Sequence, residues 1–212
     1  MTKYHKIQTV YNRDPDDNFK TVIPGDWSLP EFDILKKINW IWTEKIDGTN
    51  IRVMWDGASV SFAGKTDNAQ IPPHLLKKLQ EIFTEDLMND KFFGSFNICL
   101  YGEGYGAKIQ KGGGDYIPDG VDFILFDIKI GNWWLKREDV ISIADSLDIM
   151  VVPEIGRGPL SIAIDLAERG FLSTVSKMER VAEGLVMRPP VELFNRRGRR
   201  IICKIKHKDF KK

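Results

Sequence analysis

The sequence predicts an α+β fold with mainly antiparallel sheets and flanking helices. Short apolar runs of strand-like character are more frequent than helical segments. Hairpin signals join several of these runs, and Asp56-Gly57 is the strongest. Helices interrupt the strands irregularly, whereas a parallel sheet requires a regular β–α–β alternation. The 212 residues are 42% hydrophobic and can bury a sizeable core, and no repeat or linker-like segment is visible. We therefore expect residues 1–212 to form a single domain.

In the first half of the chain, residues 1 to about 28 are polar and rich in turn residues, so irregular structure is expected there. A short helix begins near Leu29-Pro30 and ends at Leu35. Apolar strand-like runs follow at 40–42, 51–55 and 60–63. Pro72-Pro73 begins a helix that runs to about Met88, because its leucines recur on one stripe.

The second half contains the strongest strand, over 121–130, which only Asp122, Asp127 and Lys129 interrupt. A buried strand over 96–101 precedes it, and residues 132–135 are expected to form a hairpin with the strand over 121–130. The remaining elements are helices over 136–147, 160–169 and 174–182, a short strand over 150–153, and strands over 184–188 and 200–206.

The overall charge says little about partners, because 31 basic residues face 30 acidic ones. The distribution of charge is more informative, since residues 196–212 are rich in arginine and lysine and contain a single acid, Asp209. Such a cluster suits a phosphate-rich partner. A solvated edge with a disordered tail explains it equally well.

The compartment is indicated by the two cysteines and by the absence of targeting signals. Cys99 and Cys203 sit in apolar runs without metal-type spacing, so we expect reduced, buried thiols. The start of the chain has no apolar signal region, and no apolar run approaches the roughly 18 residues that cross a bilayer. The sequence therefore predicts a soluble, cytoplasmic protein without a membrane partner.

Lys45 is the most unusual charged residue, since it lies between two apolar strand-like runs and is followed by Asp47 and Gly48. If the strand continues through this stretch, Lys45 and Asp47 share one face. A lysine amine is protonated and inert at its ordinary pKa of about 10.4. Burial or neighbouring cations lower that pKa and make the amine a nucleophile. A surface lysine beside a tight turn is the simpler explanation of these few residues.

Other charged residues also stand within or at the ends of apolar strands: Glu103, Asp127, Glu183, Lys204 and Lys206. Each alone has a structural explanation, such as an ion pair or an exposed strand face. Together they fit nucleotide chemistry with a divalent metal, in which carboxylates bind Mg²⁺ and lysines neutralise phosphates. Neither a dinucleotide-binding glycine fingerprint nor a P-loop is present, so nucleotide binding must be of another kind.

The order of these residues resembles the covalent nucleotidyltransferase superfamily of polynucleotide ligases and mRNA capping enzymes. The resemblance covers nearly the whole chain and consists of Lys-Ile-Asp-Gly at 45–48 (motif I), Tyr-Gly-Glu at 101–103 (motif III), Phe-Ile-Leu-Phe-Asp at 123–127 (motif IIIa), Glu-Gly-Leu-Val at 183–186 (motif IV) and Lys-Ile-Lys at 204–206 (motif V). It implies the nucleotidyltransferase (ATP-grasp-like) domain fold, which agrees with the α+β prediction.

Within the superfamily, Thr49 and Asn50 after motif I resemble the nick-sealing RNA ligase branch, since DNA ligases and capping enzymes usually carry arginine where Asn50 stands. The segment 115–120 is also similar to that branch. Asp47 departs from it, because many of its members have histidine there, and this keeps a minimal ATP-dependent DNA ligase open. A self-adenylating nucleotide- or RNA-binding domain is a further alternative, although none of the five motifs is broken.

The resemblance implies that Lys45 attacks the α-phosphate of ATP and forms lysyl-AMP, after which AMP passes to a 5′-phosphate and a 3′-hydroxyl displaces it. It implies that Glu103 holds the ribose, that Phe126 stacks on adenine, and that Lys204 and Lys206 hold the α-phosphate. Asp47 and Glu183 would place the Mg²⁺ or Mn²⁺ ion. The remaining expected nucleotide contacts are Glu44, Gly48, Asn50 and a basic residue, either Arg52 or Lys65.

Only six residues follow Lys206, whereas most ligases continue into a C-terminal OB-fold or helical domain. The chain therefore corresponds to the adenylyltransferase domain alone. We expect nicked RNA or an RNA-containing duplex as substrate. The grip on it would come from the basic C-terminal strand, from residues 196–200, or from a partner protein that replaces the missing domain. Self-adenylation is predicted, and sealing by the isolated domain is left open.

Overall fold

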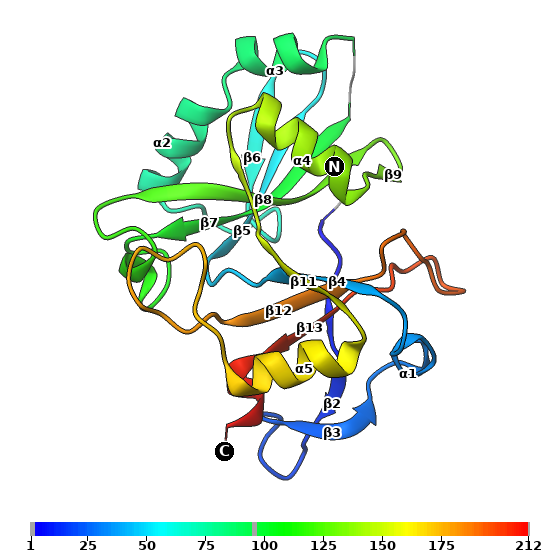
Figure 1. The fold of residues 1–212 in the computed structure, drawn as a ribbon. Helices are drawn as coiled ribbons and strands as arrows, with labels where there is room; N and C mark the ends of the chain where they lie inside the picture. Colours follow the sequence, from blue (N-terminus) through cyan, green and yellow to red (C-terminus); the bar gives the residue numbers. More distant parts are fainter. Residues whose placement is uncertain (1–2, 95–96, 212) are drawn as a thin grey trace. The chain divides into compact units, whose positions relative to one another are not determined.

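The computed structural model describes residues 3–94 and 97–211 (Figure 1). The chain divides into two compact units, each with its own core, and each is described by itself. Unit 1 comprises Met1–His5, Asp47–Val152 and Ser176–Met178. Unit 2 comprises Lys6–Ile46, Pro153–Val175 and Glu179–Lys212.

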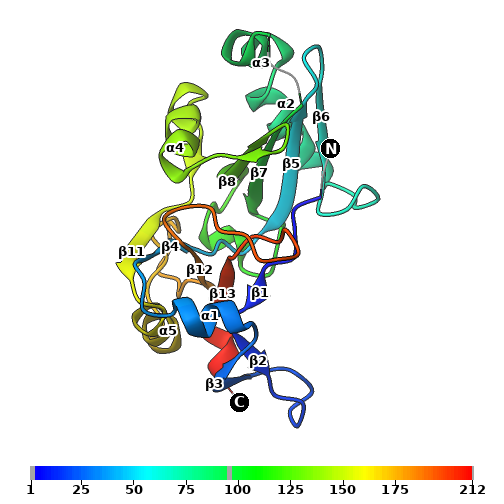
Figure 2. The same ribbon diagram turned by 90° about the vertical axis from the view of Figure 1, so that its right-hand side faces the viewer.

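Unit 1 is built on a six-stranded sheet that is antiparallel except for the pairing of β10 with β8. Its strands, in spatial order, are β10 (Met150–Val151), β8 (Val121–Ile130), β7 (Ile98–Gly106), β5 (Thr49–Trp55) and β6 (Val60–Ala63), and β9 (Trp133–Trp134) pairs with β8. Figure 2 shows β5, β7 and β8 side by side.

Three helices cover one face of this sheet: α2 (Pro73–Ile82), α3 (Glu85–Phe92) and α4 (Arg137–Ser146). Their buried side chains meet alternate residues of the strands, such as Ile51 and Val53 of β5. The intervening residues, Asn50 and Arg52, therefore point to the opposite face. A short 3₁₀ helix, η1 (Gly113–Asp115), lies in the loop between β7 and β8.

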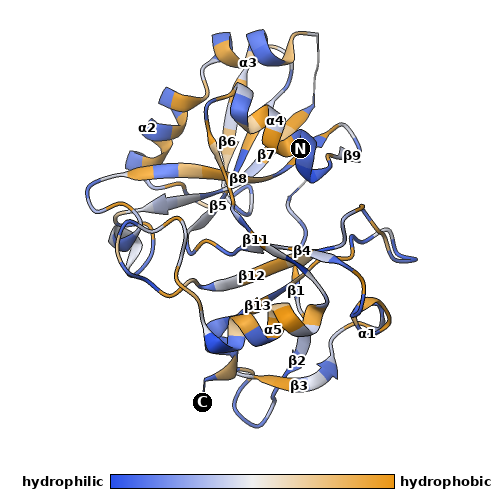
Figure 3. Cartoon of the chain, viewed as in Figure 1, coloured by the Kyte–Doolittle hydropathy of each residue, from blue (hydrophilic) through white to orange (hydrophobic). Residues whose placement is uncertain are grey.

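Unit 2 contains a five-stranded sheet in the order β1 (Gln8–Thr9), β13 (Cys203–Lys206), β12 (Gly184–Arg188), β4 (Trp40–Glu44) and β11 (Glu154–Gly158). Only the β1–β13 pair is parallel. The largely apolar helix α5 (Leu160–Arg169) packs on the sheet in a shared core (Figure 3). The unit also holds α1 (Pro30–Leu35), the β2 (Tyr11–Arg13)–β3 (Val22–Trp27) pair and the 3₁₀ helix η2 (His207–Phe210).

The predicted α+β class is confirmed, and most predicted elements are present within a few residues of their expected bounds. Three short strands, β1 to β3, occupy the first part of the chain, where irregular structure was expected. Strand β11 was not predicted either, because its glycines, Gly156 and Gly158, weaken the strand pattern. Those glycines accommodate the indole ring of Trp42, since a Cβ atom at Gly156 would lie 3.0 Å from it.

Two helix predictions are wrong in detail. The helix expected over 72–88 is interrupted, because Thr84 caps a new helix by accepting a hydrogen bond from the Leu87 N–H. The segment 174–182 is not helical, since its serine and threonine side chains bond to distant groups, such as Ser176 to the Asp115 carbonyl at 2.8 Å. The predicted start of β7, Phe96, lies outside the described residues.

The strand that contains Trp42 ends at Glu44, and the next begins at Thr49. Lys45 and Asp47 are therefore not part of one continuous strand, and the alternation that would put them on one face does not apply. Motif I contributes Lys45 to unit 2 and Asp47 and Gly48 to unit 1.

Candidate functional site

Lys45 is held by groups of the neighbouring strand in unit 2. Its backbone N–H donates to the Gly184 carbonyl at 2.9 Å, and its side-chain Nζ lies 2.6 Å from Oε2 of Glu183. The other oxygen of that carboxylate, Oε1, lies 2.5 Å from Nζ of Lys206. The Glu183 carboxylate therefore bridges two ammonium groups that come from the ends of β4 and β13.

Gly184 explains why motif IV needs a glycine after its glutamate. Its φ is +153°, and a Cβ atom there would lie 2.1 Å from the Ile205 carbonyl oxygen and 2.6 Å from Cα of Lys206. Only glycine lets β12 and β13 approach this closely, because those contacts are with backbone atoms that cannot move aside. The close approach holds Glu183 within reach of Lys206.

Lys204 and Lys206 share one face of β13, as the sequence predicts. Cys203 and Ile205 point into the core of unit 2, and both are fully buried. The alternate side chains therefore point to the other face of the sheet. Lys204 is paired in register with Val186, and Lys206 with Gly184, which places both amines beside motif IV.

The charge balance at this cluster keeps Glu183 ionised. Burial raises the pKa of its carboxyl, but the charges and hydrogen bonds of Lys45 and Lys206 outweigh burial and hold the pKa below its ordinary value. A carboxylate in such an ion pair stabilises the ammonium form of the lysine. Before Lys45 can act as a nucleophile, it must therefore lose a proton and leave Glu183.

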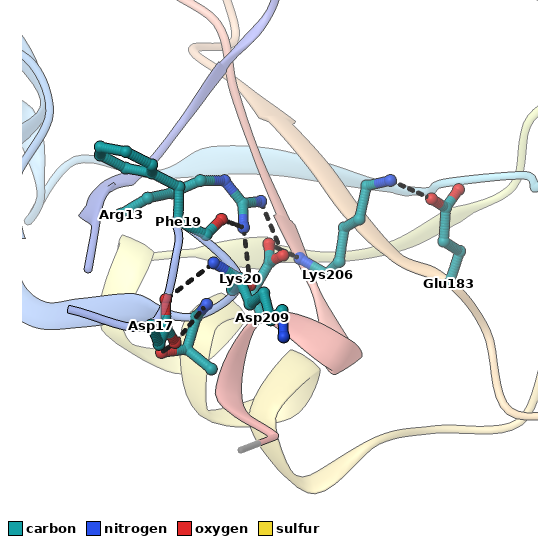
Figure 4. A network of polar contacts seen from close by, with 8 residues as sticks. Arg13, Asp17, Phe19, Lys20, Glu183, Lys206 and Asp209 are labelled. Carbon is teal, nitrogen blue, oxygen red and sulfur yellow. Dashed lines mark hydrogen bonds and ion pairs between the residues drawn. The ribbon is translucent and has the colours of Figure 1, made fainter. Parts of the chain in front are cut away.

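The backbone of Lys206 is held by a hydrogen-bond network that the sequence did not indicate (Figure 4). Its backbone N–H donates to Oδ2 of the fully buried Asp209 at 2.9 Å. The other oxygen of Asp209 accepts from the Arg13 guanidinium at 2.7 Å. Arg13 also donates to the carbonyls of Phe19 and Lys20, so the β2–β3 loop is tied to the end of β13.

Asp209→Ala is expected to lower the free energy of unfolding by about 3 kcal/mol, because it leaves Arg13 and the Lys206 N–H without their shared acceptor. Urea denaturation measures this loss. Lys20→Ala is the matched control, since Lys20 offers Arg13 only its backbone carbonyl and its removal should leave stability unchanged. Equal stability of Asp209→Ala and wild type would contradict the prediction.

Glu44, an expected nucleotide contact, is 1% exposed and bound within unit 2. Its carboxylate accepts from the Ser173 hydroxyl, and from the backbone N–H and hydroxyl of Thr174 at 2.9 Å each. These contacts tie the loop after α5 to the residue that precedes Lys45. They give Glu44 a positioning role.

Glu44→Ala is expected to cost about 3 kcal/mol of unfolding free energy, because three donors lose a buried charged acceptor. Ser173→Ala removes one of these donors and should cost about 1 kcal/mol. Comparing the two variants by chemical denaturation tests the ranking. A larger loss for Ser173→Ala would show that the carboxylate is not the centre of this contact.

In unit 1, Asn50 and Glu103 lie directly opposite one another on β5 and β7. Glu103 was expected to close its strand, but β7 continues past it to Gly106. Gly48 packs against this pair, since a Cβ atom there would lie 2.3 Å from the Gly104 carbonyl oxygen and 2.8 Å from Cγ of Glu103. Motif I therefore needs its glycine because motif III lies against it.

Asn50 offers an acceptor that the protein does not use. Its Oδ1 atom is buried and accepts no hydrogen bond from residues 3–94 and 97–211. A buried acceptor without a donor is costly, so such an atom usually serves a ligand or an ordered water. A ribose hydroxyl or an adenine amino group fits this atom and the neighbouring Glu103 carboxylate.

Phe126 lies at a β-bulge. Tyr101 of β7 pairs with Asp127 and the next residue, Gly102, pairs with Leu125, so Phe126 is the additional residue on β8. A bulge re-aims a side chain, and it leaves Phe126 half-buried while Leu125 stays in the core. Tyr4 contacts the Phe126 ring edge-on at 5.0 Å between centroids and donates to Asp127 Oδ2 at 2.8 Å.

Arg52 and Lys65 were both candidates for the basic phosphate contact, and they differ in environment. Arg52 is 1% exposed and donates to the Gly64 carbonyl at 2.9 Å and to Oδ1 of Asp67 at 2.7 Å. The Arg52 hydrogen bond lowers the pKa of the Asp67 carboxyl. Lys65 is exposed in the loop that Arg52 supports. Lys65 is therefore the better placed of the two to meet a phosphate.

No group of three or more metal-ligating side chains occurs among the described residues. Glu183 fits a divalent ion only in part, because both of its oxygens bind ammonium groups. Mg²⁺ keeps several of its waters, so one or two carboxylates can hold it. A metal role for the Glu183 carboxylate is compatible with this chemistry.

The sequence did not single out Tyr4, Arg13, Ser173, Thr174 or Asp209 as parts of the site. Arg13 and Asp209 are 196 residues apart, and no local pattern links them. Asp209 carried one usable signal, since it is the only acid in a basic segment. A lone carboxylate there has nearby cations to pair with.

An α+β fold with a lysine after β4, a glutamate before β12 and two lysines on β13 defines the nucleotidyltransferase class. The family model for RNA ligases matches residues 38–206, and the chain belongs to the RNA ligase family. A comparison with curated proteins found no match. None of the helices within 3–94 and 97–211 has the length and apolarity to span a bilayer.

Solved structures of an RNA ligase from Naegleria gruberi share the fold. The structure with PPi has a TM-score of 0.67 and 18% identity, and the match covers 97% of this chain and 56% of that one. A mutant with ATP and Mn gives 0.66 and 17% over 97% and 56%, and a mutant with AMP and Mn gives 0.63 and 18% over 89% and 52%. The chain thus spans a little over half the length of these ligases.

Proposed function

We propose that the chain is an ATP-dependent RNA ligase that acts through a lysyl-AMP intermediate. The observation that carries the proposal is the ion-paired cluster of Lys45, Glu183 and Lys206, at the positions of motifs I, IV and V, in a member of the RNA ligase family. On this proposal both units together form one adenylyltransferase domain over residues 1–212. The two free, buried cysteines support a cytoplasmic location.

In the first step, Nζ of Lys45 bonds to the α-phosphorus of ATP and the bond to the bridging oxygen breaks, so that pyrophosphate leaves. Lys206 and Lys204 neutralise the oxygens of the α-phosphate, because both point to the face of the sheet that bears motif IV. Glu183 holds Lys45 until the nucleotide binds. The Lys45 side chain is partly exposed, so its ammonium proton passes to solvent water before the nitrogen–phosphorus bond forms.

Mg²⁺ or Mn²⁺ would be held by Glu183 and Asp47 and would supply charge neutralisation at the phosphates. The ATP, AMP, PPi and Mn in the structures of the Naegleria gruberi ligase correspond to the substrate, the transferred group, the leaving group and such a metal. For the nucleoside, Glu103 and Asn50 would bind the ribose, and Phe126 would stack on adenine. The unused Asn50 acceptor supports this assignment.

AMP would then pass from Lys45 to the 5′-phosphate at a nick, and an RNA 3′-hydroxyl would displace it to form the phosphodiester. A further domain or a partner protein would be required only for grip on the substrate, not for adenylation. Self-adenylation would need only the motifs, whereas sealing would also need contacts with the duplex.

The test is incubation of the protein with each of the four α-labelled nucleoside triphosphates and Mg²⁺ or Mn²⁺, followed by denaturing electrophoresis. Label transferred from ATP alone is expected. Transfer from GTP instead would overturn the ATP assignment and favour a capping-type enzyme. Absence of transfer from any of the four would leave a nucleotide- or RNA-binding module.

Matched nicked duplexes with RNA or DNA on the 3′-hydroxyl side then distinguish the substrates. Faster sealing of the RNA nick supports the RNA ligase, as Asn50 suggests. Equal or faster sealing of the all-DNA nick would favour the minimal DNA ligase that Asp47 keeps open. Adenylated protein that seals neither nick would indicate that a partner is needed.

A further inference from the structure

The segment between β12 and β13 forms a hairpin with a basic tip. We call residues 193–201 the arginine hairpin. Phe194 and Arg200 form a β-bridge, and the Ile201 N–H donates to the Leu193 carbonyl at 2.8 Å. At the tip, Arg196, Arg197 and Arg199 are all exposed. In Figure 1 the hairpin projects from the ends of β12 and β13.

The tip has a defined conformation. Oδ1 of Asn195 accepts the backbone N–H groups of Arg197 and Arg199, both at 3.0 Å. The Asn195 N–H donates to the Arg199 carbonyl at 2.9 Å, and Gly198 provides a left-handed residue with φ +69°. These hydrogen bonds stabilise the turn, and the arginine side chains extend from it.

The charges of the tip are not neutralised by the protein. Glu192, the nearest preceding acid, is already bound by the buried Arg200 through Oε1 and Oε2 at 2.5 and 2.6 Å. No further acid occurs before Asp209, which Arg13 and Lys206 occupy. The tip arginines form no ion pair with the described part of the chain. Arg200 stabilises the base of the hairpin, whereas the tip arginines stabilise nothing within it.

Three guanidinium groups on one turn suit a row of phosphates. Each guanidinium is planar and can bind a phosphate through two parallel hydrogen bonds. Phe194, 52% exposed at the base of the tip, adds an aromatic surface against which a base or sugar can pack. Clustered like charges repel one another, and a bound polyanion relieves that repulsion.

The hairpin lies at the end of β12 that is remote from Lys45 and Lys206, which both meet Gly184 at the other end. Glu183 immediately precedes β12, and Arg188 ends it. Five residues of extended chain span about 17 Å. That length corresponds to roughly five base pairs of a duplex at 3.4 Å each. The hairpin is thus suited to a backbone several nucleotides from the reacting phosphate.

We propose that the arginine hairpin binds the phosphate backbone of the RNA substrate about five or more nucleotides from the nick. The proposal rests on the proposed function for the identity of the polyanion. The contact is independent of sequence and contributes grip on the substrate, while the adenylation step at Lys45 does not require it.

The test variant replaces Arg196, Arg197 and Arg199 together by glutamine. Binding of a nicked RNA duplex is measured by fluorescence anisotropy over a range of KCl concentrations. The slope of log K against log salt should fall in magnitude by about 2 to 3, because each lost phosphate contact removes roughly 0.9. Affinity at low salt should fall on the order of tenfold to hundredfold. Self-adenylation with ATP should stay within about twofold of wild type.

Two matched variants serve as controls. Replacing Lys77, Lys91 and Lys136 by glutamine changes the net charge equally on exposed positions of the helical face of unit 1, and it should leave the salt slope unchanged. Replacing the three tip arginines by lysine keeps the charge and should restore most of the slope. If the lysine variant binds well and the glutamine variant does not, the hairpin itself tolerates substitution and the loss comes from the missing charge.

Duplex length gives an independent readout. On duplexes with arms of about 16 base pairs on both sides of the nick, wild type should bind more tightly than the glutamine variant. When the arm on one particular side is cut to about 4 base pairs, the difference should vanish, because the backbone no longer reaches the hairpin. A difference that persists with short arms on both sides would overturn the placement.

An unchanged salt slope in the glutamine variant, or an equal fall in the Lys77, Lys91 and Lys136 control, overturns the proposal. If RNA binding is unaffected while binding of a labelled polyglutamate peptide is lost, the hairpin serves an acidic protein partner instead. Wild-type protein that adenylates and binds RNA, with no effect of the hairpin, refutes this inference alone. Wild-type protein that neither adenylates nor binds RNA refutes the proposed function.

Discussion

Lys45→Ala is expected to form no covalent AMP adduct when it is incubated with ATP and a divalent metal, a loss of more than about 10⁴-fold. The variant lacks the nitrogen that bonds to the α-phosphorus, and the two lysines beside motif IV, Lys204 and Lys206, come from a different strand. Denaturing electrophoresis after incubation with α-labelled ATP measures the adduct.

Folding should survive this substitution, because Glu183 keeps its ion pair with Lys206 at 2.5 Å. The unfolding midpoint in urea checks that point. Lys6→Ala, which removes an exposed lysine of the same unit, is the matched control and should adenylate normally. Label retained on Lys45→Ala at the wild-type level would refute Lys45 as the nucleophile.

The same variant separates the steps of the proposed reaction. Sealing of a nick that already carries AMP on its 5′-phosphate needs no lysine nucleophile. Lys45→Ala should therefore lose much less of its sealing rate on a pre-adenylated nick than of its adenylation rate, each compared with wild type. Equal loss of both activities would indicate that Lys45 has a structural role in addition to its chemical one.

Glu183→Gln is expected to lower the adenylation rate on the order of 10²- to 10³-fold. Glutamine has nearly the same shape but no charge, so Lys45 and Lys206 lose the carboxylate that bridges them. Glutamine would also hold the divalent metal less well than the carboxylate, so the charge on the phosphates is less well neutralised. Single-turnover adenylation at saturating ATP measures the effect.

The Glu183 carboxylate also predicts a pH dependence of stability. Its pKa is lowered in the folded protein, so its contribution is fully present above its ordinary pKa of about 4.3 and is lost as the pH falls through the folded value. The difference in unfolding free energy between wild type and Glu183→Gln, about 1 to 3 kcal/mol at pH 7, should therefore shrink below about pH 4. A difference independent of pH would contradict this assignment.

Much of the fold could be predicted from the sequence, since local periodicity determines where strands and helices form. The strand over 121–130 and the helix over 160–169 are present with the predicted bounds. Two of the errors fall where tertiary contacts override the local pattern. The segment 174–182 is not helical, because Thr174 and Ser176 form hydrogen bonds with Glu44 and Asp115 instead. Strand β1 forms because its partner, β13, lies near the other end of the chain, whereas β2 and β3 pair with each other.

The candidate site shows the same division. The sequence by itself determined the identity and order of the reactive residues, from Lys45 to Lys206, because each motif joins a charged residue to a strand end or a glycine. Only the tertiary structure decided which charges meet. The pairing of Lys45 with Glu183, the support of Lys206 by Arg13 through Asp209, and the unneutralised tip of the arginine hairpin all depend on it. Strand register brings residues more than a hundred positions apart within hydrogen-bond distance, and no local pattern encodes that choice.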